Sequence, residues 1–525
     1  MTRPWGLAIP HDIANFADMR YLNGFRFGLG LALPFSLSAC GAAPVTRQAS
    51  DTASLPKLDS AGFAKRAVAS THDWPQFGWD VGKSSSSPDP TGITAANIST
   101  LQRQQVQLDG TVDASPIYLH GVSARGSTHD VFFVTTTYGK TLAIDAGNGT
   151  ILWRFTPSGY DAWAGSRRIT NSTPAADPNR QFIYAASPDG HVQKLAVADG
   201  HSVWTTAITK LAEREKIASP LTYYHGRIIA VTGGYIGDAP PYQGHVAILD
   251  AASGKLLHVW NSLCSDRLEL LDPSSCDESG SAIWGRAGAV VDASSGDIFV
   301  ATGNAKWDGR ANWGDAVIAI DSSATKIVDN YTPTNTNELS DRDADVGSTS
   351  PVLLGGGYVA QGGKDGTIKV IEFGGTRGAT PRRGGEVQSV SSPSGTGLYS
   401  AQAVGHLGGA TTPGQSVQTF TATWLFAADG GGTAAWVVNG GKLQQKWQNK
   451  TGGTSPVLAG GLLYVYDLRG GLHVYNPESG QQVAELESGS GHWNSPIVVD
   501  GMIALPEGNA NKHQTSGVLN IWRLP

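Results

Sequence analysis

The sequence predicts an all-β protein, an eight-bladed β-propeller, on three observations: a repeated hairpin that ends in tryptophan, recurring strand starts, and a glycine-rich, charge-poor composition. Glycine accounts for 67 of 525 residues and charged residues for 16%, whereas typical shares are roughly 7% and about 25%. Short strands joined by many turns give such a composition. The repeat also changes what the length implies, because stacked units form one domain rather than several.

The repeated hairpin is clearest at Leu142–Trp153, LAIDAGNGTILW. Asp and Asn side chains bond the local backbone of a tight turn, and glycine supplies the positive φ that such turns need. The glycine and tryptophan pairs of the four copies are Gly149 and Trp153, Gly200 and Trp204, Gly254 and Trp260, and Gly441 and Trp447. Their spacing of four or six residues is even, so the tryptophan always points to the same face of its strand. We expect each tryptophan to pack against the next unit.

Strand starts that combine a small residue with proline mark the units. Proline is tolerated at the first residue of a strand, where no ladder hydrogen bond is lost. Six such starts are Ser115-Pro116, Thr173-Pro174, Ser219-Pro220, Ser350-Pro351, Ser455-Pro456 and Ser495-Pro496. Two less regular starts lie near Ala287-Gly288 and near Ala401 to Val404, which makes eight units.

The last unit is short of one strand, and we expect an N-terminal strand to complete it. After Ser495 the strand-like segments are SPIVV, MIALP and GVLNIWRL only. We expect Leu101 to Leu108 to supply the fourth strand and to close the ring by pairing the two ends of the chain. Closure removes the free sheet edges that would otherwise aggregate.

The N-terminus resembles a bacterial export signal, which we assign to residues 1–39. Arginines precede an apolar run, Phe27–Ala39, that is too short to span a membrane. The segment LSAC that ends at Cys40 resembles a lipobox, so we expect Cys40 to carry lipid. Acidic residues near the beginning make Met19 an alternative start of translation. The alternative interpretation is an uncleaved anchor followed by an ordinary cysteine.

The remaining chain divides into a tether and one domain. Residues 40–72 are rich in Ala, Ser, Pro and Thr and bury too little apolar surface to fold, whereas residues 73–525 form the propeller. Cys264 and Cys276 are left as an even pair in a polar loop, which predicts a disulfide in an exported protein. Closing so short a loop stabilises a fold by about 3 kcal/mol.

These features predict an exported lipoprotein that faces the periplasm or the cell surface, anchored by its lipid to the outer membrane. We expect a monomer. The formal net charge of −6 gives no basic surface for nucleic acid.

The four tryptophan hairpins resemble the tryptophan-docking repeat of the quinoprotein dehydrogenase propellers, and the resemblance covers residues 73 to 525. It implies a propeller with pyrroloquinoline quinone near its axis, beside a Ca²⁺ or lanthanide ion. In the family, a Glu, an Asn and one or two Asp hold the ion, and one Asp is the general base. A hard ion needs several oxygen ligands, and a base must reach the proton of a substrate hydroxyl.

Five residues match the family's site by motif. Asn304 in DIFVATGNAKW resembles the metal-binding Asn, and DRDADVGSTSPVL resembles the Asp-rich segment. The resemblance makes Asp343 the candidate catalytic base and a metal ligand, and Asp345 a further metal ligand. Lys364 in QGGKDGTIKVI resembles the residue that touches the quinone, and Trp284 in AIWGRAG resembles the tryptophan on which the quinone stacks.

Each match has a plainer interpretation. Asn304 is also an ordinary residue for a turn after a strand, and Asp343 and Asp345 also fit a solvated acidic loop. Lys364 fits a hairpin turn, and Trp284 fits one more tryptophan between blades. These alternatives stay open at the level of the sequence.

The chain also departs from the family. The position of the ligand Glu holds Tyr235, and phenol is a poor ligand for a hard cation; Asp238 would replace it only after a loop rearrangement. Ser166-Arg167 and Ser172 stand where many members have adjacent cysteines and an arginine. The other polar residues nearby, Tyr235, Tyr242 and His245, are most simply surface residues. His492 and Trp493 lie at a strand start, where propellers line the channel mouth.

Three hypotheses follow. The leading one is a lipid-anchored propeller that has lost catalysis and binds a ligand or an envelope protein partner, because the Glu and the adjacent cysteines are missing. The alternative is a dehydrogenase that uses pyrroloquinoline quinone and a metal to oxidise an alcohol or a sugar, because Asn304, Asp343, Asp345 and Lys364 are present. The third is a carbohydrate-binding or lyase-type propeller that uses aromatic residues at the channel mouth.

Overall fold

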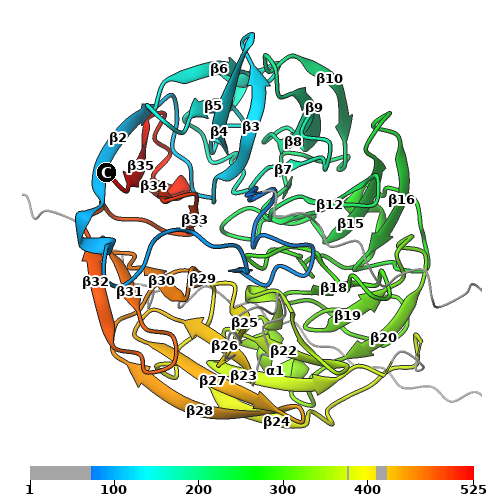
Figure 1. The fold of residues 1–525 in the computed structure, drawn as a ribbon. Helices are drawn as coiled ribbons and strands as arrows, with labels where there is room; N and C mark the ends of the chain where they lie inside the picture. The colour runs from blue at the N-terminus through cyan, green and yellow to red at the C-terminus, as the bar shows by residue number, and fades with distance from the viewer. Residues whose placement is uncertain (1–71, 375–377, 409–421) are drawn as a thin grey trace, which may run out of the picture. The chain divides into compact units, whose positions relative to one another are not determined.

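Eight antiparallel β-sheets, the blades, form a ring in the computed structural model, which describes residues 72–374, 378–408 and 422–525 (Figure 1). Each blade has four strands, and the described part of the chain is therefore an eight-bladed β-propeller, as predicted. The predicted signal peptide, Cys40 and the tether lie outside these residues. In the part that the structure describes, no helix has the length and apolar character needed to cross a membrane.

The strands of blades 1 to 4 follow the chain. Blade 1 contains β3 (Ile117–Ala124), β4 (Ser127–Thr135), β5 (Thr141–Asp145) and β6 (Ile151–Phe155), and blade 2 contains β7 (Ala175–Ala176), β8 (Phe182–Ala186), β9 (His191–Ala196) and β10 (Ser202–Ala207). Blade 3 contains β12 (Thr222–Tyr224), β13 (Arg227–Val231), β15 (His245–Asp250) and β16 (Leu256–Asn261), and blade 4 contains β17 (Val290–Val291), β18 (Ile298–Ala301), β19 (Val317–Ile320) and β20 (Ile327–Tyr331).

Blades 5 to 8 continue in the same way. Blade 5 contains β21 (Val352–Gly355), β22 (Tyr358–Gly362), β23 (Thr367–Glu372) and β24 (Gln388–Ser391), and blade 6 contains β25 (Ala403–Leu407), β26 (Ala422–Ala428), β27 (Thr433–Asn439) and β28 (Lys442–Asn449). Blade 7 contains β29 (Val457–Ala459), β30 (Leu462–Tyr466), β31 (Leu472–Tyr475) and β32 (Gln482–Leu486), and blade 8 contains β33 (Ile497–Val499), β34 (Met502–Glu507), β35 (Gly517–Arg523) and β2 (Gln102–Leu108). All eight predicted strand starts begin a blade.

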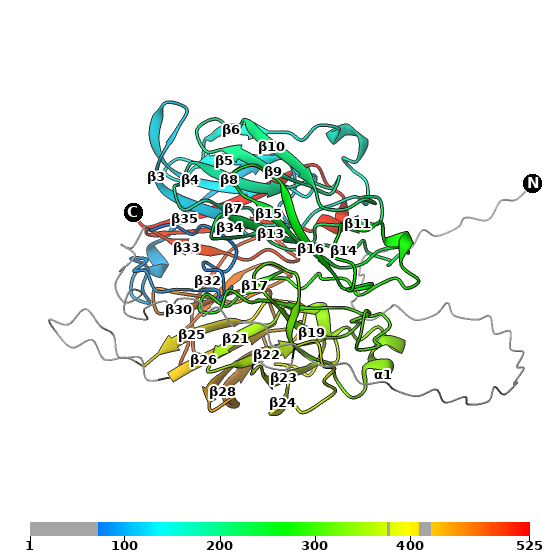
Figure 2. The ribbon, with the colours of Figure 1, turned by 90° about the vertical axis from the view of Figure 1, so that its right-hand side faces the viewer.

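Short elements connect the blades. β1 (Ser86–Ser87) adds a parallel strand to blade 7, and β11 (Glu215–Lys216) pairs with β14 (Gly233–Gly234) beside blade 3. The helical elements are η1 (Ile98–Thr100), η2 (Tyr160–Ala162), η3 (Pro273–Ser275), α1 (Thr336–Asp341), η4 (Val346–Ser348) and η5 (Ala510–Lys512). Figure 2 shows β11, β14 and α1 on one side of the ring.

The predicted ring closure is confirmed. β2 pairs antiparallel with β35 along its whole length, from Gln102 opposite Arg523 to Leu108 opposite Gly517. Val106 and Leu108 point into the core between blades, while Gln105 and Gln107 are exposed. The ring therefore has no free edge at the point where its two ends meet.

The hairpin tryptophans dock on the glycine turn of the next blade. Trp153 of blade 1 donates from Nε1 to Val197 O at 2.9 Å, and its ring lies against Gly200 of blade 2. Trp204 meets Gly254 and Trp447 meets Gly480 in the same way. The Gly480 turn was not predicted, because no tryptophan follows it in blade 7.

Gly200→Ala is expected to lower the free energy of unfolding by about 2 to 4 kcal/mol. Gly200 has φ +79°, which costs a side chain roughly 1–2 kcal/mol, and the new Cβ would lie 2.4 Å from Trp153 Cε3, an overpacking worth about 1–3 kcal/mol. Gly126→Ala is the matched control, since Gly126 has φ +84° and open space around its Cβ position. Urea unfolding of both variants checks this, and equal losses would contradict the docking role.

The segment that precedes β2 was not predicted and crosses the ring (Figure 1). Trp74 exchanges backbone hydrogen bonds with Tyr118 of blade 1, and Val81 O accepts from Val291 N of blade 4. Ser85 O accepts from Leu458 N of blade 7. Residues 74–91, the crossing segment, thus tie blades from opposite parts of the ring.

Candidate functional site

The structure brings together the five residues that the family resemblance singles out. Trp284 precedes β17 and Asn304 follows β18, while Asp343 and Asp345 lie between α1 and β21, and Lys364 follows β22. In an antiparallel blade the beginning of the first strand lies beside the end of the second. The five side chains therefore collect at one face of blades 4 and 5.

Lys364 holds the two carboxylates. Its Nζ lies 2.7 Å from Asp343 Oδ1 and 3.2 Å from Asp345 Oδ2, and its backbone N–H donates to Asp345 O at 2.9 Å. Burial alone would lower the pKa of Lys364, but the charges of Asp345 and Asp343 outweigh it and raise that pKa above its ordinary value. Lys364 is therefore a fixed cation at neutral pH.

Asn304 joins the same group through its amide. Its backbone N–H donates to Asp345 Oδ1 at 3.2 Å, and its Nδ2 donates to Asp343 Oδ1 at 2.8 Å. Its Oδ1 is buried and has no hydrogen-bond partner among the described residues. An unpaired buried oxygen is costly, so this atom is the clearest candidate to bind something that the structure does not hold.

Trp284 lies in this group rather than on a hairpin glycine. Its Nε1 donates to Asp345 Oδ2 at 3.0 Å, and Lys364 Nζ lies 5.4 Å from its ring centroid. Trp493 stacks on it with centroids 5.8 Å apart and planes 22° apart, and Tyr399 lies at 6.3 Å. One part of the aromatic surface that the quinone would use is thus taken by Trp493.

Asp315 was missed at the level of the sequence. It is fully buried, and its Oδ1 accepts from Val346 N at 3.1 Å while its Oδ2 has no partner among the described residues. Burial, with the nearby charge of Asp345, raises the pKa of Asp315 to about 8. An Asp in a loop before an apolar strand gives no signal of such burial.

Tyr235 does not point toward Asn304, and its predicted surface position is wrong. Its hydroxyl donates to Pro188 O at 3.2 Å and to Ala212 O at 3.0 Å, and its ring packs in a buried aromatic cluster. Asp238 accepts a hydrogen bond from Tyr242 Oη at 3.2 Å, and burial raises its pKa. No residue of the described structure takes the place of the family's Glu beside Asn304.

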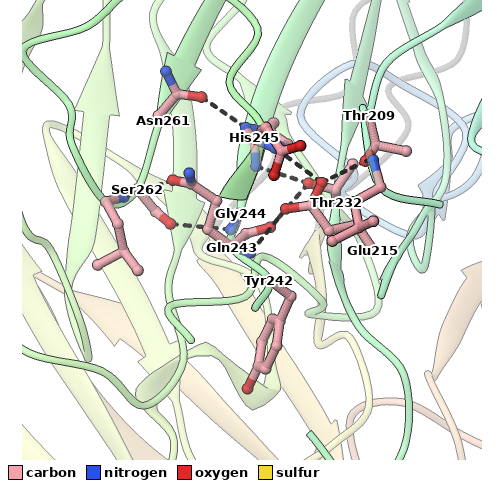
Figure 3. Close-up of polar contacts among 12 residues, drawn as sticks. Thr209, Glu215, Thr232, Tyr242, Gln243, Gly244, His245, Asn261 and Ser262 are labelled. Carbon is pink, nitrogen blue, oxygen red and sulfur yellow. Dashed lines mark hydrogen bonds and ion pairs between the residues drawn. The ribbon is translucent and has the colours of Figure 1, made fainter. Parts of the chain in front are cut away.

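His245 and Tyr242 are likewise buried, contrary to the prediction. His245 Nε2 lies 3.2 Å from Glu215 Oε2, and its Nδ1 lies 2.7 Å from Asn261 Oδ1 (Figure 3). Glu215 also accepts from Gln243 N at 2.9 Å and from the Thr209 hydroxyl. Alternation within β15 suggested exposure, but the partner Glu215 comes from thirty positions earlier. The pair fixes β11, which carries Lys216.

His492 and Trp493, predicted at the channel mouth, are both held by Asp113. His492 Nδ1 lies 2.7 Å from Asp113 Oδ2, and Trp493 N donates to Asp113 Oδ1 at 2.7 Å. Burial would raise the pKa of Asp113, but His492 and the N–H donors lower it below its ordinary value. Asp113 is thus a charged anchor for Trp493. Elsewhere, Cys264 and Cys276 form the predicted disulfide.

The residues around Asn304 do not fit a resident hard cation in this arrangement. Ca²⁺ takes about six to eight oxygen ligands, whereas the oxygens available here are Asn304 Oδ1 and two carboxylates that Lys364 already contacts. In the ranges that the structure describes, no group of three or more His, Cys, Asp or Glu side chains is arranged to hold a metal ion. The missing Glu and the bound lysine have the same effect.

An eight-bladed propeller with docked tryptophans and a Trp, Asn, Asp and Lys group at one face defines a protein of the quinoprotein dehydrogenase-like class. The family described as outer membrane protein assembly factor BamB matches residues 99–267 and 383–515, more than half of the chain. The chain belongs to this family.

Individual relatives are distant. A polyvinylalcohol dehydrogenase from a Pseudomonas species is 25% identical over 277 residues, which are 50% of this chain and 40% of that protein. The chain thus spans about two fifths of the length of this curated relative. The quinohemoprotein alcohol dehydrogenase of Comamonas testosteroni has a TM-score of 0.60 at 17% identity, covering 87% of this chain and 81% of that one. BamB from Moraxella catarrhalis has a TM-score of 0.50 at 14% identity, covering 81% and 97%. At these identities the structures support the fold alone.

Proposed function

We propose that the protein is an exported, lipid-anchored propeller that binds a ligand or an envelope protein partner through a degenerate cofactor site. The observation that carries this proposal is the position of Lys364, whose ammonium group contacts both Asp343 and Asp345. The two carboxylates that the family would offer to a metal ion already have a permanent cation. Binding at this face then needs no metal.

A quinone-dependent dehydrogenase acting on an alcohol or a sugar is the second candidate. Asn304 Oδ1 lacks a partner among the described residues, and Asp343 has a side chain that is 54% exposed. Asp343 Oδ1 accepts from Lys364 and Asn304, which leaves Oδ2 toward solvent. A carboxylate in that position is able to accept a proton from a substrate hydroxyl. The polyvinylalcohol dehydrogenase relative adds support.

Binding of pyrroloquinoline quinone with and without metal separates the two candidates. We expect calorimetry to give the same affinity for the quinone in EDTA, in Ca²⁺ and in La³⁺, and we expect no dye reduction with alcohols or sugars. Asp343→Asn should then leave binding unchanged within threefold. Metal-dependent binding with dye reduction that is lost in Asp343→Asn would favour the dehydrogenase instead.

The lipid anchor is tested separately. Export with Cys40 lipidated predicts that radiolabelled palmitate enters the protein and that Cys40→Ser abolishes the label and releases the protein from the membrane fraction. Cys264 and Cys276 already pair as a disulfide, so Cys276→Ser is a matched control that should keep the label. Membrane association of Cys40→Ser would contradict the proposal.

A further inference from the structure

Two buried cations beside Trp493 have no carboxylate partner. Lys216 is 7% exposed and Arg286 is 1% exposed, and neither forms an ion pair with any described residue. By contrast, Lys364 and Lys369 are paired with aspartates. An unpaired charge at such depth costs several kcal/mol, about 3–5 when a partner has been removed. The fold keeps two such charges in one place.

The two cations converge on the same neighbours. Arg286 donates from Nε to Trp493 O at 2.9 Å and from Nη1 to Asn171 O at 3.3 Å. Lys216 Nζ lies 3.5 Å from Asn171 Oδ1 and 5.9 Å from the Trp493 ring centroid. Arg286 Nη2 is buried and has no partner among the described residues. An unused donor and an ammonium group are therefore available around Asn171.

Asp113 does not neutralise this pair. Its two oxygens accept from Asn171 Nδ2, His492 Nδ1, Trp493 N and Ala510 N, at 2.7 to 3.0 Å. One carboxylate with a full set of donors thus faces two buried cations and a histidine. Burial lowers the pKa of Lys216 to about 8 and that of Arg286 to about 10, which reflects the same lack of a partner.

The positions of both cations are fixed by the fold. Lys216 follows Glu215 on β11, and the buried contacts of Glu215 with His245 and Gln243 hold that strand in place (Figure 3). Arg286 comes two residues after Trp284, on which Trp493 stacks. The cations therefore adjoin the half-buried aromatic surface of the candidate site.

We propose that Lys216 and Arg286 form a binding site for a carboxylate anion, with Asn171 beside them and the Trp284 and Trp493 rings at its edge. A guanidinium fork matches the two oxygens of a carboxylate, and a lysine adds a second charge. The proposal rests on the proposed ligand-binding function and names the class of the ligand. A free small polycarboxylate and the carboxylates of a quinone cofactor share this chemistry.

The test uses the full chain in EDTA, titrated with citrate and, separately, with pyrroloquinoline quinone. Calorimetry and tryptophan fluorescence measure the affinity, and wild type is expected to bind at least one of the two. Lys216→Met should weaken that binding at least tenfold. Lys194→Met is the matched control, because Lys194 is also 7% exposed and also lies over aromatic rings, and it should bind as wild type does.

Stability provides the check that a structural role would fail. Without ligand, Lys216→Met should melt at or above the wild-type temperature, because it removes an unpaired buried charge. Arg286→Gln is the second variant and should also lose binding. Binding of both anions indicates that carboxylates alone suffice, and binding of the quinone alone indicates an aromatic carboxylate. No binding of either anion to wild type, or unchanged affinity in Lys216→Met, would overturn the proposal.

This outcome is independent of the test of the proposed function. Metal-dependent quinone binding with dye reduction would refute the metal-free binding role while leaving Lys216 to be judged by its own variant. Failure of both anions to bind would remove the carboxylate site but not a role for a protein partner.

Discussion

Lys364→Met is expected to lower the free energy of unfolding by about 3 to 5 kcal/mol, the cost of leaving a buried charge unpaired. Met has a similar length but leaves Asp345, 6% exposed, without its cation. Most of the loss should come from Asp345, because Asp343 is half exposed and solvent screens its charge. Chemical denaturation at pH 7 measures the effect.

A double-mutant cycle identifies the cause of this loss. Asp345→Asn in the Lys364→Met background removes the unpaired charge and should restore much of the stability, so that the coupling energy exceeds about 1 kcal/mol. Lys369→Met is the control for a lysine with one aspartate partner, Asp365. A loss below about 1 kcal/mol for Lys364→Met, with no coupling to Asp345, would show that the cation is dispensable.

Asp315 is expected to make the protein less stable as the pH rises from about 4 to about 8. Its pKa is raised to about 8 in the folded state, whereas an unfolded Asp has a pKa of about 3.9. In that range the folded state keeps a proton that the unfolded state releases, so stability falls by up to about 1.4 kcal/mol per pH unit. Above pH 8 this contribution is lost.

Asp315→Asn should remove this dependence. Asn keeps an oxygen to accept from Val346 N and carries no charge at any pH. We therefore expect the variant to equal wild type in melting temperature near pH 4 and to exceed it clearly at pH 8. Parallel pH profiles for the two proteins would rule out Asp315 as the source.

Local patterns carried most of the fold. The Ser-Pro and Thr-Pro starts and the glycine and tryptophan hairpins are local, and each reports on a strand a few residues away. Even the ring closure was predictable, since one unit lacked a strand. The crossing segment was not, because its backbone hydrogen bonds to distant blades leave no periodic trace in the sequence.

The site was predictable only where motifs existed. Asn304, Asp343, Asp345 and Lys364 were found through the family resemblance, and the structure places them in contact. Asp315, Lys216 and Arg286 were missed because burial of a charged side chain depends on segments far apart in the chain. His245 shows the same limit, since its partner Glu215 lies in another strand.

The crossing segment also bears on the order of events during synthesis. Thr91 O accepts from Gly501 N of blade 8, and Ser85 O accepts from Leu458 N of blade 7, yet these blades are the last to leave the ribosome. Residues 74–91 and β2 are made first and must wait for partners about four hundred positions later. Early blades can form as units, but the ring can close only after release of the complete chain, so a truncated product would keep its first strand and this segment open to proteases.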